Sequence, residues 1–221
     1  MKSTAHDADI VIFDWDGTLY DSADRIVQSV FSAADELDMP RPDGQRIRQV
    51  IGLGLDEAMK RAFDIQDIME ILKYTDVYKR HYHSTWAGHS ALFAGVVELL
   101  EGLSKAGKIV TIATGKSRAG LEQAMEEQSV KHCFDYTITG PETVSKPDPT
   151  MLKMTLDEFS LKPEQAVMIG DTSFDMEMAA NIAMPAIGVN WGVHTDQEML
   201  AHGPIKVAQS FTELSELLLP K

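Results

Sequence analysis

The stretch Ile10-Val11-Ile12-Phe13-Asp14-Trp15-Asp16-Gly17-Thr18 decides the fold class of this chain. Its first four residues form a continuous apolar run rich in β-branched side chains, which is typical of a strand buried on both faces of a parallel sheet. Two carboxylates, Asp14 and Asp16, follow at the C-terminal end of that strand, where ligands bind in open α/β sheets. Gly17 lets the backbone turn sharply and lets main-chain N–H groups approach an anion. The stretch therefore predicts an α/β fold with a site suited to phosphate.

The composition is that of a globular protein with an acidic excess. The chain has 221 residues and a formal net charge of −14, and this length suits one core domain with a smaller inserted domain. The acidic excess argues against nucleic-acid and membrane partners, because both present polyanionic surfaces. A small anionic substrate remains compatible with it if a metal or a few Lys and Arg side chains supply positive charge locally. No feature points to an obligate protein partner.

The N-terminal residues 1–7 lack the apolar stretch of a signal peptide, and no segment is long and apolar enough to span a bilayer. We therefore expect a cytoplasmic protein. Cys133 is the only cysteine, so the chain cannot form an internal disulfide. We interpret this lone thiol as a small buried hydrophobe.

A helical block follows the first strand. Apolar positions recur at helical spacing over 26–37, in a helix that Asp21 or Ser22 can cap, and helical patterns continue over 55–63 and 65–86. Beyond residue 95, helices alternate with apolar runs, which is typical of βαβ units in a parallel sheet. The later predicted helices are 96–106, 117–128, 149–158 and 212–219, and the later predicted strands are 109–113, 136–138, 166–169, 186–189 and 205–207.

The first strand belongs to this later series, so the helical block interrupts a domain that starts before it and resumes after it. We predict an α/β fold, a Rossmann-like parallel sheet flanked by helices, built from residues 1–20 and 89–221. Residues 21–88 form an inserted all-helical domain in this interpretation.

Three further polar clusters lie where predicted strands end or the next helix opens. They are Thr114-Gly115-Lys116, Lys146-Pro147-Asp148-Pro149 and Gly170-Asp171-Thr172-Ser173-Phe174-Asp175. Because the ends of parallel strands share one edge of a sheet, these clusters can converge on Asp14 and Asp16. A turn or a helix cap would explain any one of them alone, but four in order at strand ends indicate a site.

The four clusters resemble the four motifs of the haloacid dehalogenase-like superfamily, subfamily I, close to its phosphoglycolate phosphatase-like branch. Residues 14–18 resemble the first motif, 114–116 the second, Lys146 with Pro147 the third, and 170–175 the fourth. The match extends over nearly the whole chain. It implies a sheet with a helical cap, and a Mg²⁺-dependent phosphatase that hydrolyses a small phosphomonoester through an aspartyl phosphate.

The resemblance also implies a role for each polar residue. Asp14 would attack phosphorus, and Asp16 would protonate the leaving alkoxide and then activate water. Lys146 would pair with the nucleophile and with the transferring phosphoryl group. Mg²⁺ would be held by the carboxylates of Asp14 and Asp171 and by the backbone carbonyl of Asp16. Asp175 would support this site or act as a water-mediated ligand.

Phosphate binding is assigned through the same resemblance to strand-end residues with exposed donors, helped by the start of a helix near Ser117. The residues so assigned are Trp15 through its main-chain N–H, Gly17, Thr18, Thr114, Gly115 and Lys116. Lys116 is open to two interpretations, contact with phosphate or support of its loop.

The helical block resembles the family's cap, which closes over the strand ends and excludes water, with hinges near 19–22 and 88–93. Residues 48–54 look like the cap's specificity loop, where Arg48 either reaches a substrate anion or lies on a helix surface.

Two other functions stay open. A phosphosugar mutase of the same fold would pass the phosphoryl group back to a sugar, but mutases of this kind carry a cap histidine where this chain has Ile26. A non-catalytic phosphometabolite-binding protein would commonly lack the nucleophile or the acid, and both are present here. Asp16 argues against the dehalogenase and phosphonatase relatives, which lack that second aspartate.

Overall fold

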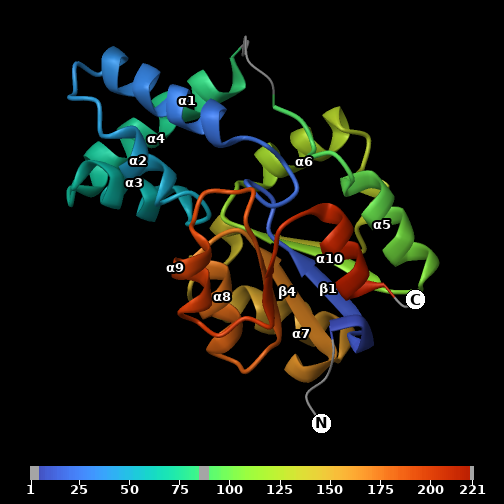
Figure 1. Ribbon diagram of the computed structural model, residues 1–221. Coiled ribbons are helices and arrows are strands. Elements are labelled where there is room, and N and C mark those ends of the chain that lie inside the picture. The colour runs from blue at the N-terminus through green and yellow to red at the C-terminus, as the bar shows by residue number, and fades with distance from the viewer. Residues whose placement is uncertain (1–4, 85–89, 220–221) are drawn as a thin grey trace.

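The sheet predicted from the sequence is present in the computed structural model, which describes residues 5–84 and 90–219 (Figure 1). Its six strands are all parallel, in the order β3-β2-β1-β4-β5-β6. The strands are β1 (Ile10–Phe13), β2 (Ile109–Thr114), β3 (Tyr136–Thr139), β4 (Ala166–Gly170), β5 (Ala186–Val189) and β6 (Lys206–Ala208). The Rossmann-like α/β class predicted above is therefore confirmed.

Ten α-helices accompany the sheet in the described residues. They are α1 (Ala23–Glu36), α2 (Gly44–Arg48), α3 (Leu55–Phe63), α4 (Ile68–His83), α5 (Val96–Lys105), α6 (Arg118–Glu127), α7 (Thr150–Phe159), α8 (Ser173–Ala180), α9 (Asp196–Leu200) and α10 (Phe211–Leu218). Short 3₁₀ helices occupy Ala5–Asp7, Lys131–Cys133, Gly140–Glu142 and Pro163–Gln165. None of the helices in the part of the chain described here combines the length and apolar character needed to cross a membrane.

Strand β1 lies at the centre because both of its edges are paired. Phe13 is in register with Ile112 of β2 and with Ile169 of β4. All four residues of β1 are fully buried, since successive side chains point into opposite helical layers. Val11 and Phe13 pack with α5, α6 and α10, whereas Ile10 and Ile12 pack with α7, α8 and α9. The continuous apolar run of β1 is thus explained by burial on two faces.

Helices α1–α4 are grouped apart from the sheet (Figure 1) and share an apolar core of their own. Tyr74 of α4 is central to it: the ring is fully buried and its hydroxyl donates to the carbonyl of Val30 in α1. A smaller cluster around Val50, Leu53 and Ala58 adjoins it. The sequence prediction of an all-helical segment after β1 agrees with these elements.

The two connections between this helical group and the sheet run side by side. The N–H of Phe93 donates to the carbonyl of Leu19, and the N–H of Asp21 donates to the carbonyl of Ala91. The expected hinges 19–22 and 88–93 meet at this point, although residues 88 and 89, and with them the predicted border between 21–88 and 89–221, lie outside the described residues. So does the end of the predicted helix 65–86, whose described counterpart is α4.

The cysteine is less buried than expected. Cys133 lies at the edge of the layer formed with α5, α6 and α10 and is only partly buried. It sits at the end of a short 3₁₀ helix, at the margin of the core.

Burial of β1 makes a direct prediction about stability. Replacing Ile12, which is fully buried, by Ala (Ile12→Ala) should lower the free energy of unfolding by about 2–5 kcal/mol, because buried methylene groups are lost and a cavity remains. The control, Leu72→Ala, shortens a side chain on α4 that is 45% exposed. It should change the free energy of unfolding by less than about 0.5 kcal/mol. Urea unfolding followed by circular dichroism measures both, and equal losses would contradict the assigned packing.

Candidate active site

Lys146 joins the separate polar clusters at the C-terminal edge of the sheet. Its Nζ donates to Oδ1 of Asp14 at 2.7 Å and to Oδ1 of Asp175 at 2.6 Å. All three side chains are completely buried. Asp14 follows β1, Lys146 lies between β3 and α7, and Asp175 lies in the first turn of α8. The convergence expected from strand ends of one sheet is therefore found for these three residues.

Asp171 adds a third carboxylate to the same point. Asp14, Asp171 and Asp175 each offer an oxygen, and these oxygens lie within 4.8 Å of one another. Oδ1 of Asp171 accepts from the hydroxyl of Thr18 at 2.7 Å, and Oδ2 accepts from the N–H of Val193 at 2.9 Å. Asp171 is thus fixed by the motif loop that follows β1 and by the loop that follows β5.

The charge of this cluster is unbalanced, as three buried carboxylates share one lysine. Burial raises the pKa of Asp14 well above its ordinary value, although Lys146 opposes the rise. Burial and the nearby Asp175 raise the pKa of Asp171 to about 7. Burial alone would lower the pKa of Lys146, but Asp14 and Asp175 outweigh it and hold that pKa above its usual value. The cluster would be stabilised by additional positive charge.

A hard divalent cation fits this donor set. Oδ2 of Asp14 is buried and has no hydrogen-bond partner among the described residues, and a buried oxygen left in this state is costly. Carboxylate oxygens are the ligands that Mg²⁺ prefers. Both oxygens of Asp175 already accept hydrogen bonds: Oδ1 from Lys146, and Oδ2 from the hydroxyl (2.6 Å) and the N–H (3.2 Å) of Thr172. The carboxylate of Asp16 is not part of this group of three.

Asp16 instead faces the helical group. Its Oδ1 accepts from the hydroxyl of Ser22 at 2.7 Å and from Nζ of Lys116 at 3.1 Å. Nζ of Lys116 also donates to the hydroxyl of Tyr82 in α4 at 2.9 Å. Burial opposes protonation of Lys116, but Asp16 and the tyrosines raise its pKa above the usual value. Lys116 therefore links Asp16 to the helical group. Ser22, at the N-cap of α1, uses its hydroxyl on Asp16 and makes no side-chain cap bond.

Gly115 allows the helical group to approach the strand ends closely. A Cβ on Gly115 would lie 2.3 Å from the carbonyl oxygen of Leu53 and 2.7 Å from that of Gly52, which is too close for any side chain. Next to Leu53, the N–H of Gly54 donates to the hydroxyl of Ser145 at 2.8 Å. The segment 52–54 is thus held against the sheet edge at two places.

The motif loop after β1 is tightly bonded within itself. The N–H of Gly17 donates to the carbonyl of Tyr20, and the N–H of Thr18 donates to the carbonyl of Trp15. Gly17 has φ +88°, and a Cβ there would lie 2.3 Å from Oδ2 of Asp171. The indole of Trp15 is fully buried in the core and stacks on Tyr20, with ring centroids 5.6 Å apart. Only main-chain atoms of Trp15 are therefore available to a ligand.

Arg48 does not lie at the edge of the sheet where the other predicted site residues meet. Its guanidinium pairs with Asp24 of α1 on the surface of the helical group. Thr114, by contrast, is buried at the end of β2, where its hydroxyl accepts from the N–H of Lys116 at 3.2 Å. Arg48 is absent from the described residues that line the pocket beside Asp16, whereas Thr114, Gly115 and Lys116 line it.

Several residues that hold the site together carry no sequence signal. Tyr82 and Ser145 make their contacts with Lys116 and Gly54 because the helical group packs on the sheet edge. Ser22 contacts Asp16 locally, six residues further along the chain. His194 is buried after β5, where Nδ1 accepts from the N–H of Ser173 at 3.0 Å and Nε2 lies 3.2 Å from the carbonyl oxygen of Gln49. A carbonyl can only accept, so Nε2 carries the proton. His194 thus bridges the core and the helical group.

Comparison with known proteins gives a consistent result. The family model of the haloacid dehalogenase-like hydrolases matches residues 11–189. The chain is similar to the protein named probable phosphatase IndB of Dickeya dadantii, with 32% identity over 212 residues that cover 93% of this chain and 91% of that one. It is also similar to the phosphoglycolate phosphatase of Vibrio parahaemolyticus, with 27% identity over 229 residues that cover 97% of this chain and 98% of that one.

Among solved structures, a haloacid dehalogenase-like family hydrolase from Streptococcus pneumoniae superimposes with a TM-score of 0.81 at 26% identity, covering 94% of this chain and 97% of that one. The chain has the fold of such a hydrolase, with buried carboxylates at one edge of a parallel sheet. This chain belongs to the haloacid dehalogenase-like hydrolases, which confirms the family that the four motifs predicted.

The unbalanced charge predicts an unusual stability effect in the metal-free protein. Between the ordinary aspartate pKa of about 3.9 and the pKa of about 7 in the folded state, Asp171 binds a proton only when folded. Because the folded protein binds more protons than the unfolded chain in this pH range, the free energy of unfolding decreases as pH rises through it. Asp171→Asn should raise the Tm in EDTA at pH 8 by several degrees and leave it almost unchanged near pH 4.

The asparagine can be accommodated, since the Thr18 hydroxyl can accept from the new amide while the amide oxygen accepts from Val193. The matched variant Asp175→Asn should lower the Tm, because both oxygens of Asp175 face donors from Lys146 and Thr172. Scanning calorimetry measures both variants. A lower Tm for Asp171→Asn at pH 8 would contradict the charge analysis.

Proposed function

We propose that this protein is a Mg²⁺-dependent phosphatase that hydrolyses a small phosphomonoester through an aspartyl phosphate on Asp14. The observation that carries the proposal is the buried contact of Lys146 with Asp14 and Asp175, beside the unpartnered oxygen of Asp14. The reaction class has independent support. The family is one of hydrolases and the similar curated proteins are named phosphatases, so the chain is a phosphatase of this family.

We assign the metal to Asp14, Asp171 and the backbone carbonyl of Asp16, with Asp175 holding Lys146 in place as a support. When bound, Mg²⁺ would offset the negative charge of the phosphate and favour the ionised form of Asp14. Lys146 holds one oxygen of Asp14 by a direct hydrogen bond, so the carboxylate has a fixed orientation. It also supplies positive charge where the phosphoryl group transfers.

The reaction takes two displacements in this proposal. A carboxylate oxygen of Asp14 forms a bond to phosphorus while the bond to the leaving oxygen breaks, and Asp16 gives its proton to that oxygen. Asp16 then takes a proton from water, whose oxygen attacks phosphorus and releases phosphate and free Asp14. Ser22 and Lys116 fix the carboxyl group of Asp16 for both steps.

Phosphoryl oxygens would be bound at the start of α6 by the Thr114 hydroxyl and the main-chain N–H of Gly115, while the N–H of Lys116 donates to the Thr114 hydroxyl and holds it in place. From the loop after β1 we assign the N–H of Trp15, because the N–H groups of Gly17 and Thr18 already bond to carbonyls of the same turn. Thr18 would act indirectly, through its hydrogen bond to Asp171.

We propose that residues 21–88 act as a cap over a core of residues 1–20 and 89–221. The contacts of Lys116 with Tyr82, Ser145 with Gly54 and His194 with Gln49 join the two parts at the sheet edge. Closure of this kind excludes water while Asp14 attacks. We assign Arg48 to the cap surface, where it pairs with Asp24.

The chemistry is tested by phosphate release from a panel of phosphomonoesters, with and without Mg²⁺. Asp14→Asn should lower kcat by at least about 1,000-fold, because the amide cannot form the aspartyl phosphate. Treatment with EDTA should reduce activity to background, and added Mg²⁺ should restore it.

Asp76→Asn is the matched control, since Asp76 is exposed on α4. Full activity of Asp14→Asn, or activity that persists after complete metal removal, would contradict the mechanism. Isomerised product in place of free phosphate would favour the mutase, and ligand binding without turnover would favour the binding protein.

The cap contact is tested separately by Gly115→Ala. The added Cβ would collide with the carbonyl groups of Gly52 and Leu53, so the cap should seat incorrectly and kcat/KM should fall by about 100-fold. Gly44→Ala is the control, because a Cβ there meets Phe31 at an ordinary 3.7 Å. Steady-state kinetics and thermal unfolding distinguish lost closure from lost folding. A Gly115→Ala enzyme with unchanged kcat/KM would show that this contact is not needed for turnover.

A further inference from the structure

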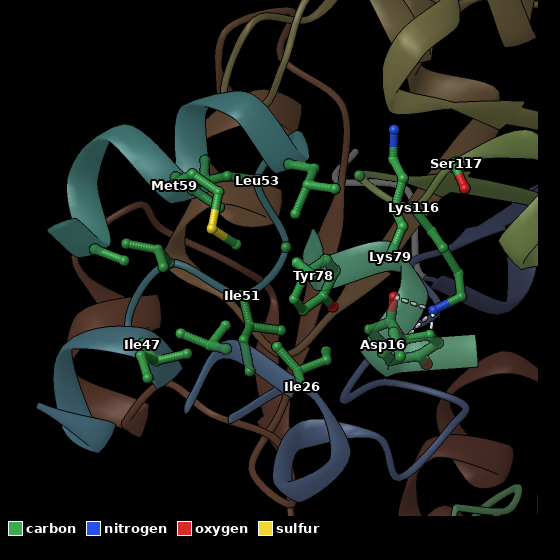
Figure 2. Close-up of a pocket in the computed structure, with 18 of the residues that line it drawn as sticks. Asp16, Ile26, Ile47, Ile51, Leu53, Met59, Tyr78, Lys79, Lys116 and Ser117 are labelled. Carbon is green, nitrogen blue, oxygen red and sulfur yellow. Dashed lines mark hydrogen bonds and ion pairs between the residues drawn. The ribbon is translucent and has the colours of Figure 1, made fainter. Parts of the chain in front are cut away.

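A pocket of about 90 Å³ lies between helices α1–α4 and the strand ends, beside Asp16 (Figure 2). This volume is several times the roughly 10–15 Å³ that one water molecule needs. Asp16, Thr114, Gly115, Lys116 and Ser117 line it on the side of the sheet. The pocket therefore adjoins the acid and the phosphate-binding loop of the proposed function.

The rest of the pocket wall is predominantly apolar. The apolar residues that line it are Ile26, Val30, Ile47, Val50, Ile51, Leu53, Leu55, Ala58, Met59 and Ala62. Tyr78 and Tyr82 of α4 add aromatic rings, which offer large apolar contact areas. Figure 2 shows the side chains of Ile26, Ile47, Ile51 and Met59 gathered on the side away from Lys116. The pocket thus has a charged end at the sheet and an apolar end in the helical group.

The positive groups that line the pocket do not offer a free partner to a second anion inside it. Nζ of Lys116 is bonded to Asp16 and Tyr82. Lys79 and His83 are exposed, and in Figure 2 the side chain of Lys79 extends away from Asp16. A carboxylate placed against the isoleucines would lose its hydration without gaining an ion pair, which is costly. The pocket is therefore poorly suited to a leaving group such as glycolate.

The position of Asp16 relates this pocket to the leaving group. In the proposed function Asp16 protonates the leaving oxygen, so the alcohol must extend from the phosphorus into the space that Asp16 lines. Resting on that function, we infer that the preferred substrate is the phosphomonoester of an uncharged alcohol with an apolar body of several carbon atoms. The apolar end of the pocket binds that body.

The inference is tested with three alkyl phosphates: benzyl phosphate, ethyl phosphate and phosphoglycolate. Benzyl and ethyl alcohols are both unactivated leaving groups, so their comparison reports contact with the pocket. We expect kcat/KM for benzyl phosphate to exceed that for ethyl phosphate by at least about tenfold. Phosphoglycolate should be no better than ethyl phosphate.

A matched pair of variants locates the effect. Ile26→Thr and Ile26→Val shorten the same side chain to nearly the same shape and differ in polarity. We expect the benzyl-to-ethyl ratio of kcat/KM to fall several-fold further in the threonine variant than in the valine variant. Because the measurement is a ratio within one enzyme, a uniform loss of folded protein does not change it.

The outcomes separate this inference from the proposed function. Phosphate release that depends on Asp14 but shows equal kcat/KM for all three esters, or a preference for phosphoglycolate, would overturn the apolar substrate class and leave the phosphatase intact. An unchanged ratio in Ile26→Thr would also overturn it. Absence of Asp14-dependent phosphate release from any ester would overturn the proposed function itself, and the inference with it.

Discussion

The buried contact of Lys146 with Asp14 and Asp175 is the interaction on which the rest of the structure depends. Lys146 lies 132 residues from Asp14 in sequence, and their side chains meet without any exposure to solvent. A single buried charge in this place would be strongly unfavourable, so the three groups must arrive together. They do so because β1 is central in the sheet and its neighbours end at the same edge. Asp171 completes a group of three buried carboxylates whose negative charge Lys146 alone does not balance.

The two parts of the molecule contribute different kinds of side chain to the pocket beside Asp16. The sheet edge supplies charged and hydrogen-bonding groups, whereas α1–α4 supply the apolar wall of the pocket. Lys116 stands between them, bonded to Asp16 on one side and to Tyr82 on the other. Gly115 permits the close approach of segment 52–54 that brings the two parts together. Residues of both parts therefore line the pocket beside Asp16.

The sequence predicted the parts of the fold that depend on local pattern. The strand at 10–13 was predicted to the residue, because continuous burial on both faces requires a continuous apolar run. Helix α8 was not predicted, because its apolar residues are spread around all sides of the helix and form no amphipathic pattern. Asp14 and Lys146 were predicted to converge because both lie in ordered motifs. Tyr82 and His194 were not predicted to lie at the site, because their contacts arise from packing between distant segments.

In the mechanism that we propose, Asp14, held by Lys146, becomes phosphorylated during turnover. The most direct test is rapid acid quenching of the enzyme during hydrolysis of a ³²P-labelled phosphomonoester with Mg²⁺, followed by peptide mapping. We expect label on the peptide that contains Asp14, and we expect hydroxylamine to release that label, as it does from an acyl phosphate. Turnover without any labelled protein, or label on a different residue, would contradict it.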